Sequence, residues 1–454
     1  MKTGAILQLI GNTPLIELSG FDTGVCRLFV KLECQNPGGS IKDRIGLSMI
    51  EAAERDGKLL PGGTIVEATA GNTGLGLALV AAQKNYHVVL VVPDKMSQEK
   101  IFHLRALGAE IILTRSDVVK GHPKYYQDLA QKIASETEGA FYVDQFSNTA
   151  NPLAHETTTG PELWEQMQQK LDAVVCGVGS GGTITGLTKY FKKVAPHVEM
   201  VLADPEGSVL VEYIKSGTIG TAGSWLVEGI GEDFIPPLCD LSAVKQAYTV
   251  SDKESFKVAR ELLLKDGILA GSSSGTLIAA ALRYCREQKE AKNVATFVCD
   301  TGNKYLSKMY NDYWMIDNHF MDRPASGNLC DVIARRHLEG EVITVASDDV
   351  LSVAYGRMRL YDISQLPVLD GDKVVGILDE SDLLRAVYSD KAAFTEGVGQ
   401  HMATNLRTVT PETSLEELLK LFDEGLVPIV SDHDKFYGLI TPIDLVNFLR
   451  GQAA

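Results

Sequence analysis

Lys42 is the residue whose type and position most clearly predict chemistry. It lies in the segment NPGGSIKDR, residues 36–44, and the apolar residues that follow have the spacing of a helix that begins close to the lysine. An amine near the start of a helix lies in a positive local field, which helps it to lose a proton and attack an electrophile. The alternative is that Lys42 is a solvated lysine in the first turn of a helix.

Two glycine-rich turns could complete a binding site around this lysine. Residues 69–74 (TAGNTG) follow one predicted strand, and residues 177–183 (GVGSGGT) follow another. Glycine leaves backbone N–H groups open to the close approach of anions. A lysine that can form a Schiff base, together with a cradle for phosphate, is what pyridoxal 5′-phosphate requires. The sequence therefore predicts an enzyme that uses this cofactor.

The glycine-rich turns also allow other interpretations. Residues 177–183 match G-x-G-x-x-G after a strand, with Asp204 at a distance that suits the ribose of a dinucleotide, which would make the protein an NAD oxidoreductase. The first turn could use glycine for its geometry alone. The dinucleotide interpretation leaves Lys42 and the first turn unexplained. A phosphate cup, in which hydroxyl groups of Ser180 and Thr183 join the backbone amides, accounts for them together.

Polar side chains in and near these turns suit the rest of the cofactor and a substrate. The hydroxyl groups of Thr69 and Thr73 suit a carboxylate, and the Asn72 amide suits a phenolic oxygen. Ser273, in the segment GSSSG at residues 271–275, could hydrogen-bond a pyridine nitrogen. A hydroxyl does not hold that nitrogen protonated as a carboxylate would, which favours β-elimination. The alternative for this segment is a serine-rich helix cap.

Composition and charge exclude several other classes of protein. The 454 residues, 45% hydrophobic and 22% charged, are typical of a globular protein. The net charge of -16 argues against nucleic acid or an anionic membrane as a partner. Seven cysteines without CxxC spacing and scattered histidines predict reduced thiols and no metal site. No signal peptide or membrane span is evident, so we expect a cytoplasmic protein.

The order of predicted elements indicates an α/β protein. From about residue 60 to residue 320, short β-branched runs alternate with helical patterns, which is typical of parallel sheets. One series of predicted strands covers residues 64–68, 88–92, 111–113 and 141–143, and a second covers residues 173–176, 200–203 and 296–299. Two such series predict two doubly wound subdomains, with ligands bound where the strand ends meet.

The C-terminal part of the sequence contains a weak internal repeat. Leu366-Pro367-Val368 recurs as Val427-Pro428-Ile429, so the two prolines are 428 − 367 = 61 residues apart. A unit of that length cannot bury a sheet face well, so we expect the two copies to pack as one module.

Together these motifs resemble the cysteine synthase and cystathionine beta-synthase family of fold-type II pyridoxal-phosphate enzymes. The resemblance begins at LIGNTPL (residues 9–15), runs to about residue 320 and includes the two turns as well as the segments DQF, DPEGS and EGIG. The tail resembles a tandem α+β regulatory (Bateman) module, which often binds adenosine derivatives. The pairing of such a catalytic domain with such a tail is more similar to the cystathionine beta-synthase branch. The expected domains are residues 1–320 (catalytic), 321–337 (linker), 338–391 and 396–451 (regulatory repeats).

The resemblance also implies roles for individual residues. Lys42 would bind the cofactor covalently and then move the Cα proton. The other cofactor-binding residues would be Asn72, Gly179, Ser180, Gly181, Gly182, Thr183 and Ser273. The substrate carboxylate would bind to Thr69, Ala70, Gly71, Thr73 and Gln145.

The reaction implied is a β-replacement. L-serine or L-cysteine loses hydroxide or sulfide and gains a homocysteine thiolate, which yields L-cystathionine with water or hydrogen sulfide. Glu232 would place a carboxylate near the mouth of the site, where it could meet the amino group of the second amino acid. The nearest alternative is a cysteine synthase that uses O-acetylserine and sulfide. The alternative outside enzymes is an adenosine-nucleotide sensor whose catalytic half has lapsed.

The resemblance carries further expectations for cofactors and partners. Haem-containing animal relatives have an N-terminal extension that this sequence lacks, so we expect no haem. The ribose-contact pattern of the regulatory family is met by Thr441 and Asp444 in the second repeat, whereas the first repeat has Asp379 in place of a hydroxyl residue. The alternative for the tail is a purely structural or dimerising role. The family implies a homodimer or a higher homo-oligomer.

Overall fold

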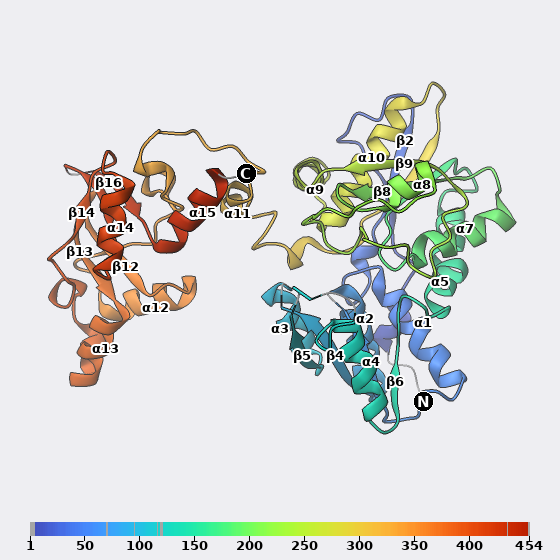
Figure 1. The fold of residues 1–454 in the computed structure, drawn as a ribbon, viewed down its shortest axis with the longest axis horizontal. Coiled ribbons are helices and arrows are strands. Elements are labelled where there is room, and N and C mark those ends of the chain that lie inside the picture. The colour runs from blue at the N-terminus through green and yellow to red at the C-terminus, as the bar shows by residue number, and fades with distance from the viewer. Residues whose placement is uncertain are drawn as a thin grey trace. The chain divides into compact units, whose positions relative to one another are not determined.

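The computed structural model describes residues 5–452, apart from residues 70, 95, 116, 119, 120 and 434. The chain divides into two compact units, Met1–Tyr310 and Asn311–Ala454. The first unit is coloured blue to yellow-orange in Figure 1 and the second orange to red. Each unit is described separately below.

One part of the first unit is a four-stranded parallel sheet with the order β5-β4-β3-β6. Its strands run in chain order as β3 (Thr64–Ala68), β4 (His87–Pro93), β5 (Glu110–Thr114) and β6 (Ala140–Tyr142). Helices α1 (Lys42–Arg55) and α2 (Asn72–Lys84) pack on the face that carries Ile65 and Leu90. Helix α4 (Tyr126–Glu136) packs on the face that carries Val66 and Val91. Strands covered on both faces read as continuous apolar runs, as the central strands β3 and β4 do, and the less buried edge strands β5 and β6 also carry short apolar runs.

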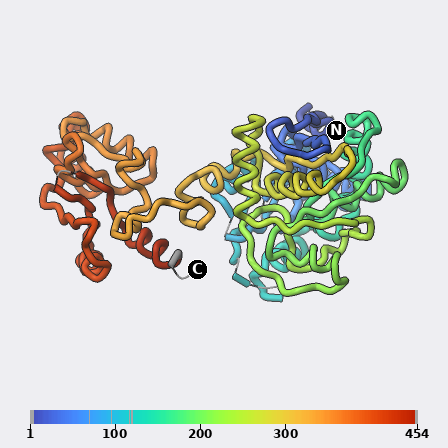
Figure 2. Tube along the Cα trace, turned by 90° about the horizontal axis from the view of Figure 1, so that it is seen from above, coloured from blue at the N-terminus to red at the C-terminus, as the bar shows by residue number. Residues whose placement is uncertain are grey.

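The other part of the first unit is a six-stranded sheet with the order β1-β2-β10-β7-β8-β9, in which only β1 is antiparallel to its neighbour. Its strands are β1 (Leu15–Glu17), β2 (Arg27–Lys31), β7 (Ala173–Cys176), β8 (Glu199–Pro205), β9 (Val244–Val250) and β10 (Asn293–Phe297). In Figure 2 the blue N-terminal segment lies beside the yellow one, as the pairing of β2 with β10 requires. The prediction of two doubly wound subdomains is confirmed. Strand β10 begins and ends earlier than the predicted residues 296–299.

Helices and short helical turns connect these strands. The remaining helices of the first unit are α3 (Gln98–Ala106), α5 (Ala150–Ala154), α6 (Gly160–Gln166), α7 (Gly182–Val194), α8 (Leu210–Ser216), α9 (Asp252–Asp266) and α10 (Ser272–Glu287). Its short turns are η1 (Ala5–Leu9), η2 (Glu33–Gln35), η3 (His155–Thr159) and η4 (Gly302–Lys304). Strands β3, β6, β7 and β10 all lead into segments with polar residues at their carboxyl ends. These ends are where parallel sheets bind ligands.

The second unit contains two copies of the same β-α-β-β-α order. The first copy is β11 (Val345–Ala346), α12 (Leu351–Tyr361), β12 (Gln365–Asp370), β13 (Lys373–Asp379) and α13 (Glu380–Ser389). The second is β14 (Thr408–Val409), α14 (Leu415–Asp423), β15 (Ile429–Asp432), β16 (Lys435–Leu439) and α15 (Pro442–Gln452). An apolar cluster that combines Leu369 of the first copy with Ile429 and Phe436 of the second joins them. The two copies therefore share a core, as the short repeat length predicted.

The segment before the first repeat differs from the expected linker over residues 321–337. Helix α11 (Asp312–Asp317) belongs to the second unit. Within the expected linker, Leu329, Cys330, Val332 and Ile333 are buried in the core that the second repeat forms. Their apolar side chains share this core with Val430 of β15, Leu418 of α14 and Leu445 of α15. Among the described residues, no helix is long and apolar enough to cross a membrane.

Candidate active site

Lys42 is the first residue of α1, as the sequence predicted. Its backbone N–H donates to Ser40 Oγ at 3.2 Å, and the adjacent Asp43 carboxylate accepts the Gly38 N–H at 2.5 Å. Burial lowers the pKa of the Lys42 amine, and the nearby Cys299, Asp300 and Glu232 oppose that shift. A lysine whose pKa is lowered has a larger fraction of neutral, nucleophilic amine.

Arg44, two residues beyond Lys42, anchors the first turn of α1. Its guanidinium donates to both carboxylate oxygens of Glu33, at 2.7 and 2.9 Å, and to both oxygens of Glu162, at 2.7 Å each. Arg44 is 4% exposed and Glu33 is fully buried. Such bidentate pairs fix geometry as well as charge. They hold the start of the helix, and with it Lys42, against the segment that contains Glu162.

The turn after β3 places four of the predicted residues together. Thr69 Oγ1 accepts the Gly71 N–H at 3.2 Å, and Asn72 begins α2. Thr73 Oγ1 donates to Gln145 Oε1 at 2.7 Å, which joins this turn to the end of β6. Because the Gln145 amide oxygen is already used, its Nε2 is left to donate to another group. Ala70 lies outside the described residues.

The turn after β7 forms a walled cup at the start of α7. Gly181 has a φ of 83°, a conformation that favours glycine. A Cβ on Gly179 would lie 2.6 Å from the Gly229 carbonyl oxygen, and a Cβ on Gly182 would overlap the side chain of Asn151. Asn151 also donates to Ser180 Oγ at 2.9 Å. Glycine is therefore the residue type that fits at these positions, and it places no side chain over the backbone N–H groups.

Thr183 and His155 extend the same cup. Thr183 Oγ1 lies 3.2 Å from His155 Nε2, and His155 Nδ1 lies 2.9 Å from Thr159 Oγ1. Burial and the charges of Lys42 and Arg44 hold the pKa of His155 well below its usual value, so its ring is neutral. A neutral imidazole held by two hydroxyl groups positions Thr183 at the start of α7.

Ser273 is the second residue of α10. Its neighbours are occupied: Ser272 Oγ accepts the Glu228 N–H at 3.0 Å, and Ser274 Oγ accepts the Cys299 N–H at 2.9 Å. The Ser273 hydroxyl interacts with the half-buried Cys299 thiol, which also interacts with the charge of Lys42. Ser273 and Lys42 therefore both lie near Cys299.

Glu232 lies near Lys42, in the segment between α8 and β9. Burial and the neighbouring Asp233 and Asp204 raise the pKa of Glu232 to about 8, and the charge of Lys42 opposes this. Two residues beyond it, the Phe234 ring packs against the ring of Phe146 with a centroid distance of 5.8 Å. A half-buried carboxyl group therefore lies near Lys42, and an aromatic pair follows it closely in the chain.

Three features of the site fit pyridoxal 5′-phosphate. The amine of Lys42 has a lowered pKa, the cup at Gly179 to Gly182 has no room for a Cβ, and Ser180 and Thr183 supply hydroxyl groups beside a helix start. Open glycine backbone at the start of a helix suits a phosphate. No group of His, Cys, Asp and Glu residues within the described part of the chain could hold a metal ion.

Three residues that the sequence did not single out complete the pocket. Asp300 Oδ2 accepts the Asn72 Nδ2 at 2.8 Å, and Lys304 Nζ donates to Asn72 Oδ1 at 2.7 Å. Cys299 precedes them at the end of β10. All three follow the carboxyl end of the parallel strand β10, which ends at Phe297, and a position just beyond such a strand is the signal that could have identified them.

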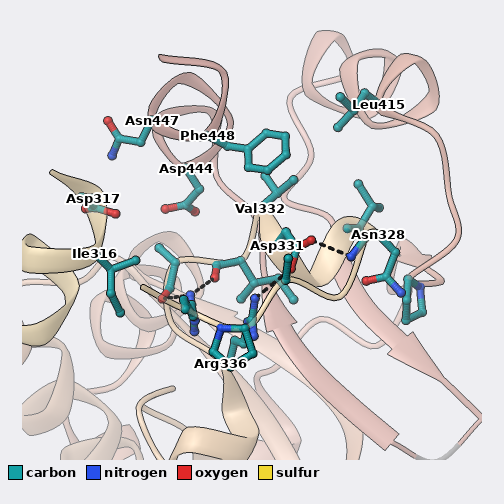
Figure 3. Close-up of a pocket in the computed structure, with 18 of the residues that line it drawn as sticks. Ile316, Asp317, Asn328, Asp331, Val332, Arg336, Leu415, Asp444, Asn447 and Phe448 are labelled. Atoms are coloured by element: carbon teal, nitrogen blue, oxygen red, sulfur yellow. Dashed lines mark hydrogen bonds and ion pairs between the residues drawn. The ribbon is translucent and has the colours of Figure 1, made fainter. Parts of the chain in front are cut away.

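In the second unit, Thr441 and Asp444 lie together as the sequence predicted. The Thr441 hydroxyl and N–H both donate to Asp444 Oδ2, at 2.6 and 2.7 Å. Asp444 also lines a cavity of about 770 Å³ within this unit. Figure 3 shows Asp444, Asn447 and Phe448 of α15 in the upper part of the view, Asp317 to their left, and Asp331 and Arg336 below them. In the first repeat, Asp379 and Asp382 instead cap each other's N–H groups at the start of α13.

Both units match families of known proteins. The family model "Pyridoxal-phosphate dependent enzyme" matches residues 6–300, and the model "CBS domain" matches residues 332–389 and 398–451. The cystathionine beta-synthase of Dictyostelium discoideum is 37% identical over 98% of this chain and 92% of its own.

Solved structures match the first unit. The crystal structure of a hydrogen sulfide-producing enzyme from Fusobacterium nucleatum has a TM-score of 0.62 and 36% identity, over 67% of this chain and 99% of that one. An O-acetylserine dependent cystathionine beta-synthase from Helicobacter pylori also has a TM-score of 0.62 and 36% identity, over 68% of this chain and 98% of that one. The chain therefore belongs to the cystathionine beta-synthase family of pyridoxal-phosphate-dependent enzymes.

Proposed function

We propose that this chain joins L-serine or L-cysteine to L-homocysteine by β-replacement, and so forms L-cystathionine with release of water or hydrogen sulfide. The observation that carries this proposal is that the turn after β3, the cup after β7 and the start of α10 each reach the surroundings of Lys42. Asn72 bonds to Asp300, Thr183 contacts His155 and Ser273 interacts with Cys299. The charge of Lys42 interacts with each of these three partners. The near full-length match to a cystathionine beta-synthase supports it. In metabolism the product would serve transsulfuration and cysteine biosynthesis.

Lys42 would hold the cofactor and move the proton that starts the reaction. Pyridoxal phosphate supplies an electron sink for breaking bonds at the amino-acid carbons. Burial lowers the pKa of Lys42, so its Nζ can take a proton from the substrate Cα and return it to the product. Gly179 to Thr183 would hold the phosphate, Asn72 the phenolic oxygen and Ser273 the pyridine nitrogen.

The turn after β3 would orient the donor amino acid. The Thr69 hydroxyl and the N–H groups of residues 70 and 71 would bind its carboxylate, while the Thr73 hydroxyl, whose one hydrogen goes to Gln145 Oε1, would hold Gln145 beside it. Because Thr73 already donates to Gln145 Oε1, the Gln145 Nε2 is directed to the same carboxylate as a further donor. These contacts hold Cα and Cβ in place beside Lys42.

Glu232 would receive the ammonium group of the acceptor. The raised pKa of Glu232, about 8, reflects a carboxyl group without a countercharge close enough to offset its burial. An incoming ammonium group supplies that countercharge and lowers the pKa of the carboxyl. An acceptor that is itself an amino acid therefore fits the site better than free sulfide, which lacks an ammonium group.

Product analysis tests this proposal against the cysteine synthase alternative. The purified chain with pyridoxal phosphate is given serine, cysteine or O-acetylserine as donor with homocysteine, and serine or O-acetylserine as donor with sulfide. We expect cystathionine in the homocysteine mixtures and little cysteine in the sulfide mixtures. Cysteine from O-acetylserine and sulfide, without cystathionine from any donor, would contradict the proposal.

The cavity beside Asp444 would bind an adenosine derivative that lacks phosphate. Two arginines line this cavity, and each already forms an ion pair. Arg336 pairs with Asp331 at 3.1 Å, and Arg323 pairs with Glu339 at 2.5 Å. Asp317 and Asp444 remain as negative groups, and each disfavours a phosphate. S-adenosylmethionine should therefore bind more tightly than AMP in equilibrium dialysis, and D444N should weaken that binding. Equal binding of both ligands, or binding of neither, would contradict this assignment.

The remaining expectations concern the whole protein. The domains would be residues 1–320, a connecting segment over residues 321–337, and repeats over residues 338–391 and 396–451. A homodimer or higher homo-oligomer would be seen by light scattering. Seven free thiols and the negative net charge support a cytoplasmic location. Absorption spectroscopy of the purified protein would test the expectation that it binds no haem.

A further inference from the structure

The Asn72 side chain is held between opposite charges. Lys304 Nζ donates to its Oδ1 at 2.7 Å, and its Nδ2 donates to Asp300 Oδ2 at 2.8 Å. Lys304 is 6% exposed and Asp300 is 1% exposed. Rotating the amide by half a turn would direct its NH₂ group at an ammonium and its oxygen at a carboxylate. Both contacts would then be repulsive, so the two charges fix a single orientation.

We propose that Lys304 and Asp300 are positioning residues that fix the Asn72 amide so that it can donate to the cofactor's phenolic oxygen. This inference rests on the role proposed above for Asn72. An amide nitrogen carries two hydrogens, and Asp300 takes one of them. The second is left to donate into the site. Without Lys304, the amide could turn and present its oxygen to the phenolic oxygen instead.

The same two residues tie Asn72 to the segment that carries Lys42. Lys304 Nζ also approaches the carbonyl oxygens of Gly38 and Gly39, at 3.3 and 3.4 Å. The backbone of Asp300 forms an isolated bridge with Ser40. The turn from Asp300 to Lys304 thus contacts both loops of the site and sets their separation.

The surroundings of Asp300 explain why its position is fixed. Tyr305 donates its hydroxyl to Asp300 Oδ2 at 2.8 Å, and Asp300 Oδ1 lies against Gly271, where a Cβ would overlap it. Asp300 Oδ1 is buried and has no hydrogen-bond partner. A carboxylate with one unpartnered oxygen is held there by Lys304, whose charge interacts with it. Burying both charges costs free energy, so the Lys304–Asp300 pair adds little to stability. Its contribution is to hold the Asn72 amide in one orientation.

The test compares variants for their equilibrium affinity for pyridoxal phosphate and for the absorption spectrum of the bound cofactor. K304M should raise the dissociation constant about tenfold, since it removes one hydrogen bond to a charged group. It should also move absorption to shorter wavelength, because a phenolic oxygen without its donor takes up a proton. K304R should restore most of both properties. K292M, which removes a lysine bonded to Glu199 and Tyr284, is the matched control and should change neither.

A double-mutant cycle with N72A separates positioning from a general effect on the fold. K304M should add little once Asn72 is absent. If K304M has the same effect in both backgrounds, or no effect in either, the inference is overturned. If K304M does not fold, D300N carries the test, because it keeps the size of the side chain, and an unchanged spectrum would overturn the inference.

The outcomes also separate this inference from the function on which it rests. If N72A leaves the spectrum unchanged, the assignment of Asn72 fails, and the positioning role fails with it. If N72A changes the spectrum and K304M does not, only the positioning role fails. Formation of cystathionine by the unmodified enzyme tests the proposed function independently of both.

Discussion

Replacing Glu232 with glutamine removes a carboxyl group whose ionisation should control capture of the second amino acid. Burial and two neighbouring carboxylates raise the pKa of Glu232 to about 8. A group with that pKa is about one-tenth ionised near pH 7 and about nine-tenths ionised near pH 9. Its attraction for the acceptor's ammonium group should therefore increase as the pH rises through this range.

The change in kcat/KM follows from the extra strength of a hydrogen bond to the ionised form of Glu232. A hydrogen bond to a charged group is worth about 1.4 kcal/mol more than a neutral one, or about tenfold in kcat/KM. Combining this factor with the ionised fractions, the ratio of kcat/KM for homocysteine between the unmodified enzyme and E232Q should rise from about 2 near pH 7 to about 9 near pH 9. Ionisation of the acceptor thiol affects both enzymes equally and cancels in this ratio.

The assay measures the steady-state rate against homocysteine concentration at saturating serine over this pH range. The same ratio for serine should not change with pH, because Glu232 is assigned to the acceptor. D233N is the matched control, because it removes a neighbouring charge that raises the pKa of Glu232. In the D233N background, the rise in the homocysteine kcat/KM ratio should therefore occur at lower pH. A homocysteine ratio that stays constant with pH would refute the assignment of Glu232.

Three further substitutions test other parts of the site. K42A should lose both turnover and the yellow colour of the bound cofactor, and a variant that kept the colour would show that another lysine binds it. G179A should weaken cofactor affinity at least about tenfold, because its Cβ would lie 2.6 Å from the Gly229 carbonyl oxygen; unchanged affinity in an equilibrium titration would place the phosphate elsewhere. R44M should lower the free energy of unfolding by about 3–5 kcal/mol, because it leaves the fully buried Glu33 carboxylate without its ion-pair partner. Hydrogen exchange of the α1 amides would measure this, with R27M, at an exposed ion pair, as a control that should change little.

The sequence predicted the fold best where strands are buried on both faces. Strands β3, β4, β7 and β8 are largely buried and carry continuous apolar runs, and each was predicted close to its observed bounds. The edge strands β5 and β6 are less buried, but their short runs are apolar and were also predicted. Strand β9, another edge strand, was missed because Lys245 and Gln246 interrupt its apolar pattern. The burial of Leu329 to Ile333 was missed because proline, glycine and asparagine around them are typical of a linker.

The sequence predicted which loops form the site but not how their side chains are paired. Glycine turns and the lysine follow from local pattern, since backbone conformation restricts the residue types that fit. The orientation of the Asn72 amide depends on Lys304, 232 residues away in the chain. Contacts of this kind depend on tertiary structure and leave no local signal.

The most direct test of the account is the mass of the product formed from serine and homocysteine in D₂O. If Lys42 removes the Cα proton and later returns one that has exchanged with solvent, the cystathionine should carry deuterium at the Cα that came from serine. K42A should form no such product. Cystathionine without deuterium at that carbon, or no cystathionine at all, would contradict the proposal that Lys42 moves the Cα proton during β-replacement.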